Sequence, residues 1–197
     1  LSNNNESIEN LKKGKKDYPK ELISFKNKLV NELRKNNKFS NTNVWILADL
    51  LEIKSGEEIW RNAVEGYLGT QKFYILTEPD AYGTALNIYN HIKNDYESSF
   101  GLVDISKLRE REVIKSKPGS LAEKIETNNP FARLYIDYLL GRVICCNSVN
   151  ELRQYKISIT SEGMLYQGYV ARRLQRKLMN DCYIGKKAIE YRFNILN

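Results

Sequence analysis

The stretch AVEGYLG at residues 63–69, followed by the apolar run FYIL at residues 73–76, decides how this chain is expected to fold. The same pattern occurs again as YIDYLLG at residues 135–141 and VICC at residues 143–146. Each copy reads as a helix that ends at Leu-Gly, then a short buried strand, then a second helix. An internal repeat of this kind predicts two related α/β lobes in one compact unit.

Local signals place the helices around these two copies. Three Ser–Glu pairs at i, i+3 spacing predict capping boxes, namely Ser55 with Glu58, Ser120 with Glu123 and Ser148 with Glu151. The first box predicts a helix from Gly56 to Leu68, with Gly69 free to adopt the left-handed conformation after it. A further helix is expected over 81–93, with Leu86, Tyr89, His91 and Ile92 on its buried side.

The strands and the domain organisation follow from the same reading. Strands are predicted at Gly101–Ile105, at 157–160 and at 164–167, and a charged loop over 106–119 is expected to join the lobes. The expected divisions are an N-terminal helical or coiled-coil root (1–43), lobe 1 (44–110), an inter-lobe loop (111–119), lobe 2 (120–180) and a C-terminal coiled-coil root (181–197).

The net charge of +7 is concentrated at the two ends of the 197-residue chain. Residues 1–39 carry +5, residues 40–149 carry −3, and residues 150–197 carry +5. Such a distribution favours polyanions, nucleic acid first among them. The alternative is a solvated surface rich in Lys and Asn, typical of an AT-rich genome.

No constellation in the sequence predicts catalysis, a metal or a cofactor. There is no phosphate-binding loop motif. The single histidine, His91, has no catalytic motif around it, so the sequence does not predict a Ser/His/Asp triad. The three cysteines lack metal-ligand spacing and are read as reduced and structural. The acidic residues Asp49, Glu52, Glu57 and Glu58 could form a metal cluster, but a helix-capping role explains two of them. No run is long and apolar enough for a membrane span, and the missing initiator Met suggests an excised piece of a longer protein.

The order of these motifs resembles the hinge domain of SMC proteins over residues 45–170. The first lobe of that family has a helix ending Leu-Gly, a strand, a helix and a last strand that opens with Gly, here Phe100-Gly101-Leu102-Val103-Asp104. The second has Leu139-Leu140-Gly141, a strand, a short helix and a Thr-x-x-Gly hairpin at 160–165. The resemblance implies two pseudo-repeated α/β lobes flanked by coiled-coil stubs, with both chain ends on one side.

Several details resemble one subfamily, the MukB-like SMC subunit (JetC) of bacterial Wadjet plasmid-defence systems. These details are the stretches 65–73, 136–141 and 164–167. The resemblance implies a long ATPase whose head, with ATP and Mg, lies outside this chain. It also implies kleisin, accessory and nuclease subunits, double-stranded DNA as substrate, and a cytoplasmic, nucleoid-associated location. One departure is that SMC hinges commonly end the second lobe with paired glycines, whereas this chain has Gly168 alone.

The resemblance also predicts a homodimer through exposed strand edges, with the first lobe of one copy meeting the second lobe of the other. The candidate interface residues are Gly101, Leu102, Val103, Met164, Leu165, Tyr166 and Gly168. The candidate DNA-binding residues, expected on one face where the arms leave, are Lys12, Lys13, Lys15, Lys16, Arg172, Arg173, Arg176, Lys177, Lys186 and Lys187. Two other hypotheses stay open, a freestanding nucleic-acid-binding domain and a small nuclease-like enzyme.

Overall fold

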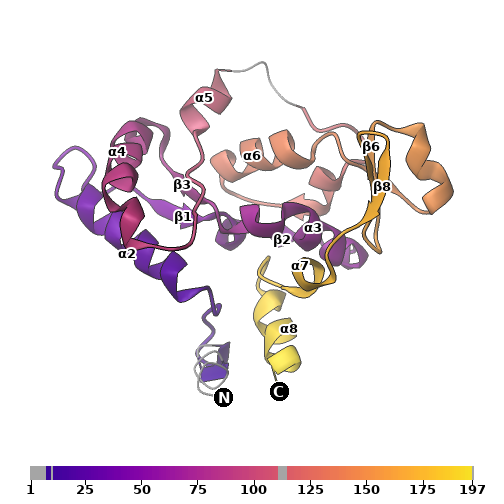
Figure 1. The fold of residues 1–197 in the computed structure, drawn as a ribbon, viewed down its shortest axis with the longest axis horizontal. Coiled ribbons are helices and arrows are strands. Elements are labelled where there is room, and N and C mark those ends of the chain that lie inside the picture. Colours follow the sequence, from indigo (N-terminus) through magenta and orange to yellow (C-terminus); the bar gives the residue numbers. More distant parts are fainter. Residues whose placement is uncertain (1–7, 10, 111–114, 197) are drawn as a thin grey trace.

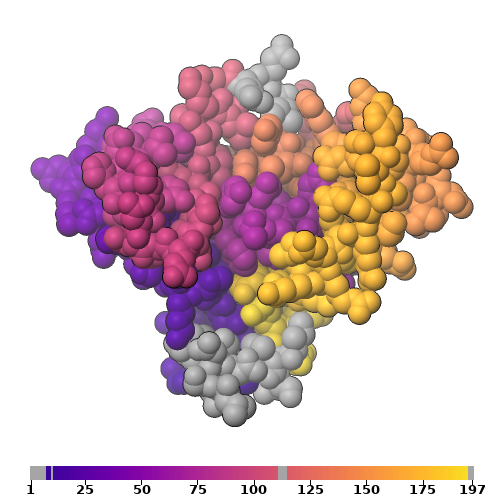
Figure 2. All heavy atoms as spheres, viewed as in Figure 1, coloured from indigo at the N-terminus to yellow at the C-terminus, as the bar shows by residue number. Residues whose placement is uncertain are grey.

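The computed structural model describes residues 8–9, 11–110 and 115–196 (Figures 1 and 2). The first half contains α2 (Lys20–Arg34), β1 (Val44–Ile46), η1 (Leu47–Leu50), β2 (Glu52–Ile53), η2 (Glu58–Trp60), α3 (Arg61–Leu68), η3 (Gly69–Phe73), β3 (Ile75–Thr77), η4 (Pro79–Ala81), α4 (Tyr82–Ile92), η5 (Lys93–Asp95) and α5 (Ile105–Arg109), where η marks a 3₁₀-helix. The second half contains η6 (Leu121–Lys124), β4 (Ile125–Glu126), α6 (Pro130–Leu140), β5 (Ile144–Cys146), η7 (Val149–Gln154), β6 (Ile157–Thr160), β7 (Met164–Gln167), β8 (Val170–Arg173), α7 (Arg176–Asn180) and α8 (Lys187–Leu196).

Three small sheets organise the chain and confirm the predicted α/β class. In the first lobe, β3 pairs antiparallel with β1, and a single parallel bridge joins Ile75 to Leu102. In the second lobe, the sheet has the order β5-β6-β7-β8, with β5 and β6 parallel and the remaining pairs antiparallel. The short pair β2–β4 joins the two halves of the chain, so the lobes share one body.

The apolar stripe of α2 forms one side of the first lobe's core. Leu22, Phe25, Leu29 and Leu33 recur at three- and four-residue steps, and all four side chains are buried. The ring of Phe25 packs against the rings of Tyr89, Tyr96 and Phe100. The helix therefore packs against α4 and the segment that follows α4, as part of the first lobe's body (Figure 1).

The last helix of each lobe packs on the other lobe. Helix α5 follows the segment 101–104 of the first lobe and packs on α6 of the second lobe. Helix α7 follows β8 of the second lobe and packs on α3 of the first lobe. The two lobes are therefore related by an exchange of short helices, and α3 and α6 are the helices that end at the two Leu-Gly pairs.

The predicted strand Gly101–Ile105 is wrong. Only Leu102 makes a strand-like bridge, and Ile105 already belongs to α5. The carboxylate of Asp104 accepts a hydrogen bond from the backbone N–H of Lys107 at 2.9 Å and so caps the helix. The same cap means that the predicted loop over 106–119 begins with a helical turn.

The capping boxes are only partly formed. The helix predicted from Gly56 begins at Arg61 after a 3₁₀ turn, and no side chain caps it. The boxes at Ser120 and Ser148 start the 3₁₀-helices η6 and η7, in which Glu123 and Glu151 accept backbone N–H groups although neither serine caps. The buried side predicted for α4 is confirmed at Ile92, which is buried, and wrong at Leu86 and His91, which are exposed. Tyr89 is half-buried, and Ala85 faces the core as well.

Candidate functional site

The described ends of the chain leave the body on the same side (Figure 1). The guanidinium of Arg192 on α8 binds both carboxylate oxygens of Asp17, with 2.6 Å between Nη2 and Oδ2. The side chain of Asp17 is almost fully buried, so water competes little for this ion pair. The expectation that the ends lie together therefore holds for the described residues, while residues 1 and 197 lie outside them.

Tyr183 is the centre of the junction between the two ends and the body. Its ring stacks on Tyr18 at 5.4 Å between centroids and meets the edge of Phe73 at 4.7 Å. The guanidinium of Arg192 lies over the same ring, 4.3 Å from its centroid. Burial raises the pKa of the Tyr183 hydroxyl to about 12.

A fully buried ion pair anchors the C-terminal segment to α3. Lys72 donates to Glu65 at 2.8 Å, and both side chains are 0% exposed. Lys72 also donates to the backbone carbonyls of Asp181 at 2.9 Å and Leu178 at 3.3 Å. The ammonium group is thus surrounded by acceptors, as a buried charge requires.

The other oxygen of Glu65 binds the backbone just before α8. It accepts the N–H groups of Tyr183 and Ile184, each at 2.7 Å. Arg61, one helical turn earlier, donates to the carbonyl of Ile184 at 2.7 Å. The two side chains therefore hold both backbone polar groups of Ile184, and they fix the point from which α8 leaves.

The second lobe repeats the same residue spacing. Arg61 and Glu65 lie eight and four residues before Gly69, and Arg133 and Asp137 lie eight and four residues before Gly141. In the second lobe the two side chains bind each other at 2.6 Å and are partly exposed. Our sequence analysis missed this Arg-x-x-x-acid-x-x-x-Gly pattern, although both copies of the repeat contain it.

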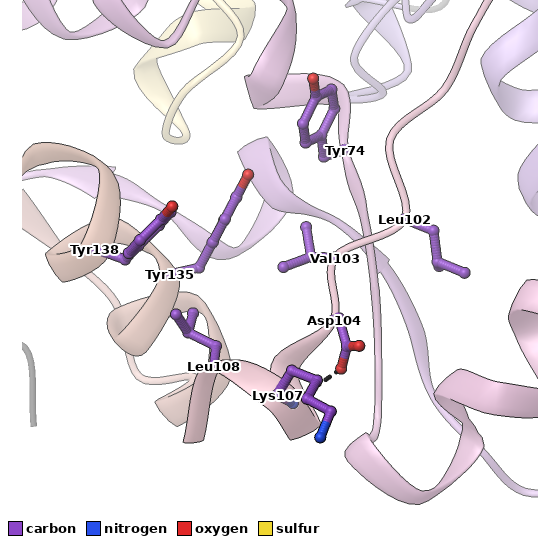
Figure 3. A pocket seen from close by; sticks show the side chains of 8 residues that line it. All are labelled: Tyr74, Leu102, Val103, Asp104, Lys107, Leu108, Tyr135 and Tyr138. Atoms are coloured by element: carbon purple, nitrogen blue, oxygen red, sulfur yellow. Dashed lines mark hydrogen bonds between the residues drawn. The ribbon is translucent and has the colours of Figure 1, made fainter. Parts of the chain in front are cut away.

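The two exchanged helices fit their partners differently. On α3, a methyl group at Gly66 would come within 2.5 Å of Met179 Cγ, so α7 lies directly against the backbone. The equivalent position on α6, three residues before the final Gly, is Tyr138. Between α5 and α6 an open cleft of about 300 Å³ remains, lined by Tyr74, Leu102, Val103, Leu108, Tyr135 and Tyr138 together with Asp104 and Lys107 (Figure 3).

The predicted interface residues of the first lobe lie along one backbone edge. Ile75 donates to the carbonyl of Gly101 at 2.8 Å, and Val103 donates to the carbonyl of Ile75 at 2.9 Å. Gly101 sits against the ring of Tyr74, where a methyl group would approach ring carbons to 2.5 Å. No strand of the described chain pairs with the other edge of this segment.

The predicted edge of the second lobe is wrong in one respect. Strand β7, with Met164, Leu165 and Tyr166, is paired on both sides, because β8 forms an additional strand beyond it. Gly168 lies in the turn between them with φ +60°. The free edge is therefore β8, all four of whose residues are exposed.

Of the six predicted DNA-binding lysines near the chain ends, three lie close to a carboxylate. Lys13 pairs with Glu9 at 2.7 Å, and Lys187 lies 3.5 Å from Glu58. Lys16 is partly buried, donates to the carbonyl of Ala48 and lies 3.4 Å from Asp49. Lys12, Lys15 and Lys186 are exposed.

The four predicted DNA-binding residues on β8 and α7 are different. Arg172, Arg173, Arg176 and Lys177 are all exposed, and none has a carboxylate of the described chain within ion-pair distance. Figure 1 shows α7 close to the chain ends, whereas β8 extends away from them along the second sheet.

The acidic residues considered as a metal cluster have separate partners. Asp49 accepts the hydroxyl of Tyr18, Glu52 accepts the backbone N–H of Lys186, and Glu57 pairs with Lys124. In the part of the chain that the structure describes, no three His, Cys, Asp or Glu residues are placed to hold a metal ion.

The cysteines and the histidine lie apart from any such group. Cys145, Cys146 and Cys182 are free, and burial raises the pKa of the Cys145 thiol to about 12. His91 is exposed, with its Nδ1 2.7 Å from the carbonyl of Asn87. Within the described ranges, no helix combines the length and apolar character needed to cross a bilayer.

The chain is similar in fold to solved SMC hinge domains. It matches the hinge domain of Geobacillus stearothermophilus SMC, solved as an asymmetric dimer, with a TM-score of 0.52 and 15% identity over 86% of this chain and 71% of that one. It matches the Pyrococcus furiosus SMC hinge domain with a TM-score of 0.53 and 17% identity over 87% and 89%. A P. furiosus Smc hinge with an extended coiled coil gives a TM-score of 0.54 and 19% identity over 99% and 79%.

The sequence itself supports the same assignment. A search of curated proteins finds no match. The family model for the SMC proteins Flexible Hinge Domain, however, matches residues 43–155, which is more than half of the chain and includes both Leu-Gly helices. With the chain ends on one side and the three small sheets, this match establishes that the chain belongs to the SMC hinge domain family.

Proposed function

We propose that this hinge forms a homodimer in which the free edge of one lobe pairs with the free edge of the other lobe in a second copy. Strand β8 is the main support for this dimer. Its four residues are all exposed, and its outer backbone groups have no strand partner within the described chain. The segment 101–104 offers a second such edge on the first lobe. Unpaired edges associate readily because their N–H and C=O groups lack partners.

Charge favours pairing between unlike edges. Pairing β8 with another β8 would bring Arg172 and Arg173 close to their own copies, and like charges on neighbouring strands are destabilising. The edge of the first lobe ends instead at the carboxylate of Asp104. Two unlike contacts close around a two-fold axis, which leaves no edge free for further growth.

Sedimentation equilibrium combined with hydrogen exchange tests this dimer. We expect a monomer–dimer equilibrium in the micromolar range, with slower exchange of the backbone amides of 101–104 and 170–173 as the protein concentration rises. A strictly monomeric mass at several hundred micromolar would contradict the proposal.

We also propose weak, sequence-blind contact with DNA phosphates. The four unpaired cations on β8 and α7 support it, because a cation without a carboxylate neighbour keeps its full attraction for phosphate. Arg176 and Lys177 on α7 stay available even when β8 is covered by a second copy. The paired lysines Lys13, Lys16 and Lys187 should contribute less.

Fluorescence anisotropy with a short duplex at increasing salt tests the DNA contact. We expect affinity to fall steeply between about 50 and 200 mM salt, with a smaller salt slope after Arg176→Gln and Lys177→Gln. The matched control is Lys13→Gln with Lys187→Gln, which changes charge equally but removes lysines that are already paired. Absence of binding at low salt would show that the basic residues serve only solubility.

For the whole protein we propose the JetC subunit of a Wadjet system, that is, a cytoplasmic, nucleoid-associated SMC ATPase of bacterial plasmid defence. Its head with ATP and Mg, and the kleisin, accessory and nuclease subunits, would lie beyond this chain. The divisions 1–43, 44–110, 111–119, 120–180 and 181–197 stay proposals of the same kind. A complete gene that encodes a Gly-x-x-x-x-Gly-Lys-Ser/Thr motif upstream and neighbouring nuclease and kleisin genes would support it, and a gene that ends with this domain would contradict it.

The hinge domain itself is proposed to be non-catalytic. The alternatives are a freestanding nucleic-acid-binding domain and a small nuclease-like enzyme. Incubation with plasmid and Mg²⁺ separates them, since nicking that survives purification would support the nuclease.

A further inference from the structure

The hairpin between β7 and β8 presents an aromatic residue in an unfavourable backbone conformation. Gly168 and Tyr169 form a two-residue loop with φ values of +60° and +64°, the pattern of a type I′ turn. Among the described residues, Tyr169 is the one non-glycine residue with positive φ. A bulky side chain is disfavoured there, and sequences usually place Gly or Asn at this position.

No packing against the described part of the chain explains why the residue is a tyrosine. Tyr169 is 94% exposed and the next residue, Val170, is 57% exposed. Together they form an apolar tip at the start of the free edge strand. Strain kept at an exposed position points to a function outside the chain's own core.

The cleft between α5 and α6 is a matching receptor for an aromatic side chain. Figure 3 shows the rings of Tyr135 and Tyr138 on one wall, with Val103 and Leu108 close by and Tyr74 at the far end. The volume of the cleft is about 300 Å³, and the Tyr138 residue is 43% exposed. Aromatic walls of this kind favour edge-to-face and offset contacts with another ring.

The two lobes differ in the residue that stands at the equivalent helix crossing. In the first lobe, Leu174, which precedes α7, and Met179 on α7 pack against Gly66, and a cleft of about 450 Å³ lies beside this contact. In the second lobe Tyr138 takes the place of that glycine, and α5 leaves an open cleft. An apolar side chain from elsewhere can complete the packing.

The occupant that fits best is a second copy of this chain. The cleft is lined by Leu102 and Val103, which belong to the free edge of the first lobe, and Tyr169 directly precedes the free edge of the second. Asp104 and Lys107 both line the cleft, and Arg172 and Arg173 follow the tip, so the Asp104 carboxylate offers these arginines a partner of opposite charge. Pairing of the two edges across copies therefore brings an aromatic tip toward an aromatic cleft.

We propose that Tyr169 of each copy inserts into the α5–α6 cleft of the other and anchors the dimer. The inference rests on the proposed edge-to-edge dimer and adds its anchoring residue and receptor. Each copy supplies one tip and one cleft, so both contacts form at once around the two-fold axis.

Sedimentation equilibrium of three tip variants tests the anchor. Tyr169→Gly should weaken self-association by roughly thirtyfold or more, the range of a dominant interface residue. Tyr169→Phe keeps the ring and should stay within about threefold of the unaltered chain. Tyr155→Ser, which removes another partly exposed tyrosine from the second lobe, should leave association unchanged. The unfolding midpoint of Tyr169→Gly should be equal or higher, because glycine relieves the positive φ.

Cross-linking tests the location of the receptor. In a background with Cys145, Cys146 and Cys182 replaced by alanine, Tyr169→Cys and Leu108→Cys are made in separate chains. A disulfide-linked dimer should form in the mixture and in neither chain alone.

Three outcomes overturn the proposal, and they separate it from the dimer on which it rests. If Tyr169→Gly dimerises as tightly as the unaltered chain, the anchor is wrong and the edge-paired dimer stands. If the unaltered chain is strictly monomeric, both fail. If Tyr169→Gly keeps its dimer but loses affinity for a single-stranded oligonucleotide, the tip serves a nucleic acid.

Discussion

The two Leu-Gly helices share their residue pattern but differ in what covers them. Helix α3 carries Arg61, Glu65 and Gly66, and α7 lies directly on its backbone. Helix α6 carries Arg133, Asp137 and Tyr138 at the equivalent positions, and α5 leaves an open cleft beside it. We call the α3–α7 crossing closed because α7 touches the backbone of α3 at Gly66, although a cleft of about 450 Å³ lies beside it. We call the α5–α6 crossing open because Tyr138 stands at the equivalent position of α6, next to the cleft of about 300 Å³.

The difference shows how one repeated motif serves two purposes. On α3, Arg61 and Glu65 both bind the backbone of Ile184, which lies just before α8. In the open crossing Arg133 and Asp137 bind each other, and Arg133 donates to the carbonyl of Ile125 within its own lobe. The first lobe thus fixes the direction of α8, and the second lobe keeps a surface for association.

Removing the acid from each helix is expected to give the largest contrast. Glu65→Ala leaves Lys72 buried without its counter-charge, and loss of one member of a buried pair destabilises by about 3–5 kcal/mol. Asp137→Ala affects a partly exposed pair whose arginine can reach water, so we expect a loss of about 1 kcal/mol. Urea unfolding with both variants measures the difference. Equal losses would show that the two crossings do not differ as described.

Tyr183, at the junction between the chain ends and the body, should lose its hydroxyl proton only at high pH. Folding raises the pKa of Tyr183 from 10.0 to about 12. The native state therefore keeps this proton at a pH where the unfolded chain has lost it. The resulting stabilisation is present below pH 10 and is lost as the pH rises through 12, in total about 2–3 kcal/mol.

The measurement is the unfolding free energy of the unaltered chain and of Tyr183→Phe between pH 9 and 12. The phenylalanine variant should lose less stability over this range, because it has no phenol to ionise. At neutral pH the two chains should be similar, since the Tyr183 hydroxyl makes only a long 3.5 Å contact with the carbonyl of Asp17. Parallel pH profiles would contradict the assignment.

Adding one methyl group to the closed crossing should loosen it. Gly66→Ala pushes against Met179, which also lies so close to Gly163 that a methyl group there would come within 2.6 Å of Met179 Cε. Overpacking of this kind costs about 1–3 kcal/mol, and the better helix propensity of alanine returns up to about 1 kcal/mol. We therefore expect a net loss of about 1–2 kcal/mol in urea unfolding.

The matched control for this loss is Gly83→Ala on α4. A methyl group there meets no atom within 4 Å, so only the propensity gain remains and the chain should become slightly more stable. Stabilisation by both substitutions would mean that α7 does not lie against α3 as tightly as described.

The repeat predicts the two α/β lobes and the helices that end at Leu-Gly, and the patterns at 157–160 and 164–167 predict the strands β6 and β7. These features depend on residues that lie close together in the sequence. The exchange of α5 and α7 between the lobes could not be predicted in this way. The exchange depends on the residue that each Leu-Gly helix presents to the short helix of the other lobe, namely Gly66 on α3 and Tyr138 on α6.

The residues at the junction of the chain ends were missed for a related reason. Asp17, Tyr183 and Arg192 are polar or amphipathic residues far apart in sequence, and only the fold brings them together. Strand β8 was missed because Val170–Arg173 has neither a buried face nor an alternating pattern, and it is held by pairing with β7 alone. Edge strands of this kind give the weakest sequence signal and are the surface that we propose for dimerisation.

The smallest expected effect concerns how the two helices begin. Asn129 accepts the backbone N–H groups of Phe131 and Ala132, each at 3.0 Å, so Asn129→Ala should destabilise α6 by about 1 kcal/mol. Ser55→Ala should change stability by less than about 0.5 kcal/mol, because α3 begins six residues later without a side-chain cap. Thermal unfolding of the two variants resolves this difference. A loss at Ser55 as large as that at Asn129 would mean that the capping box predicted from the sequence forms after all, and that the two helices start in the same way even though their ends are covered differently.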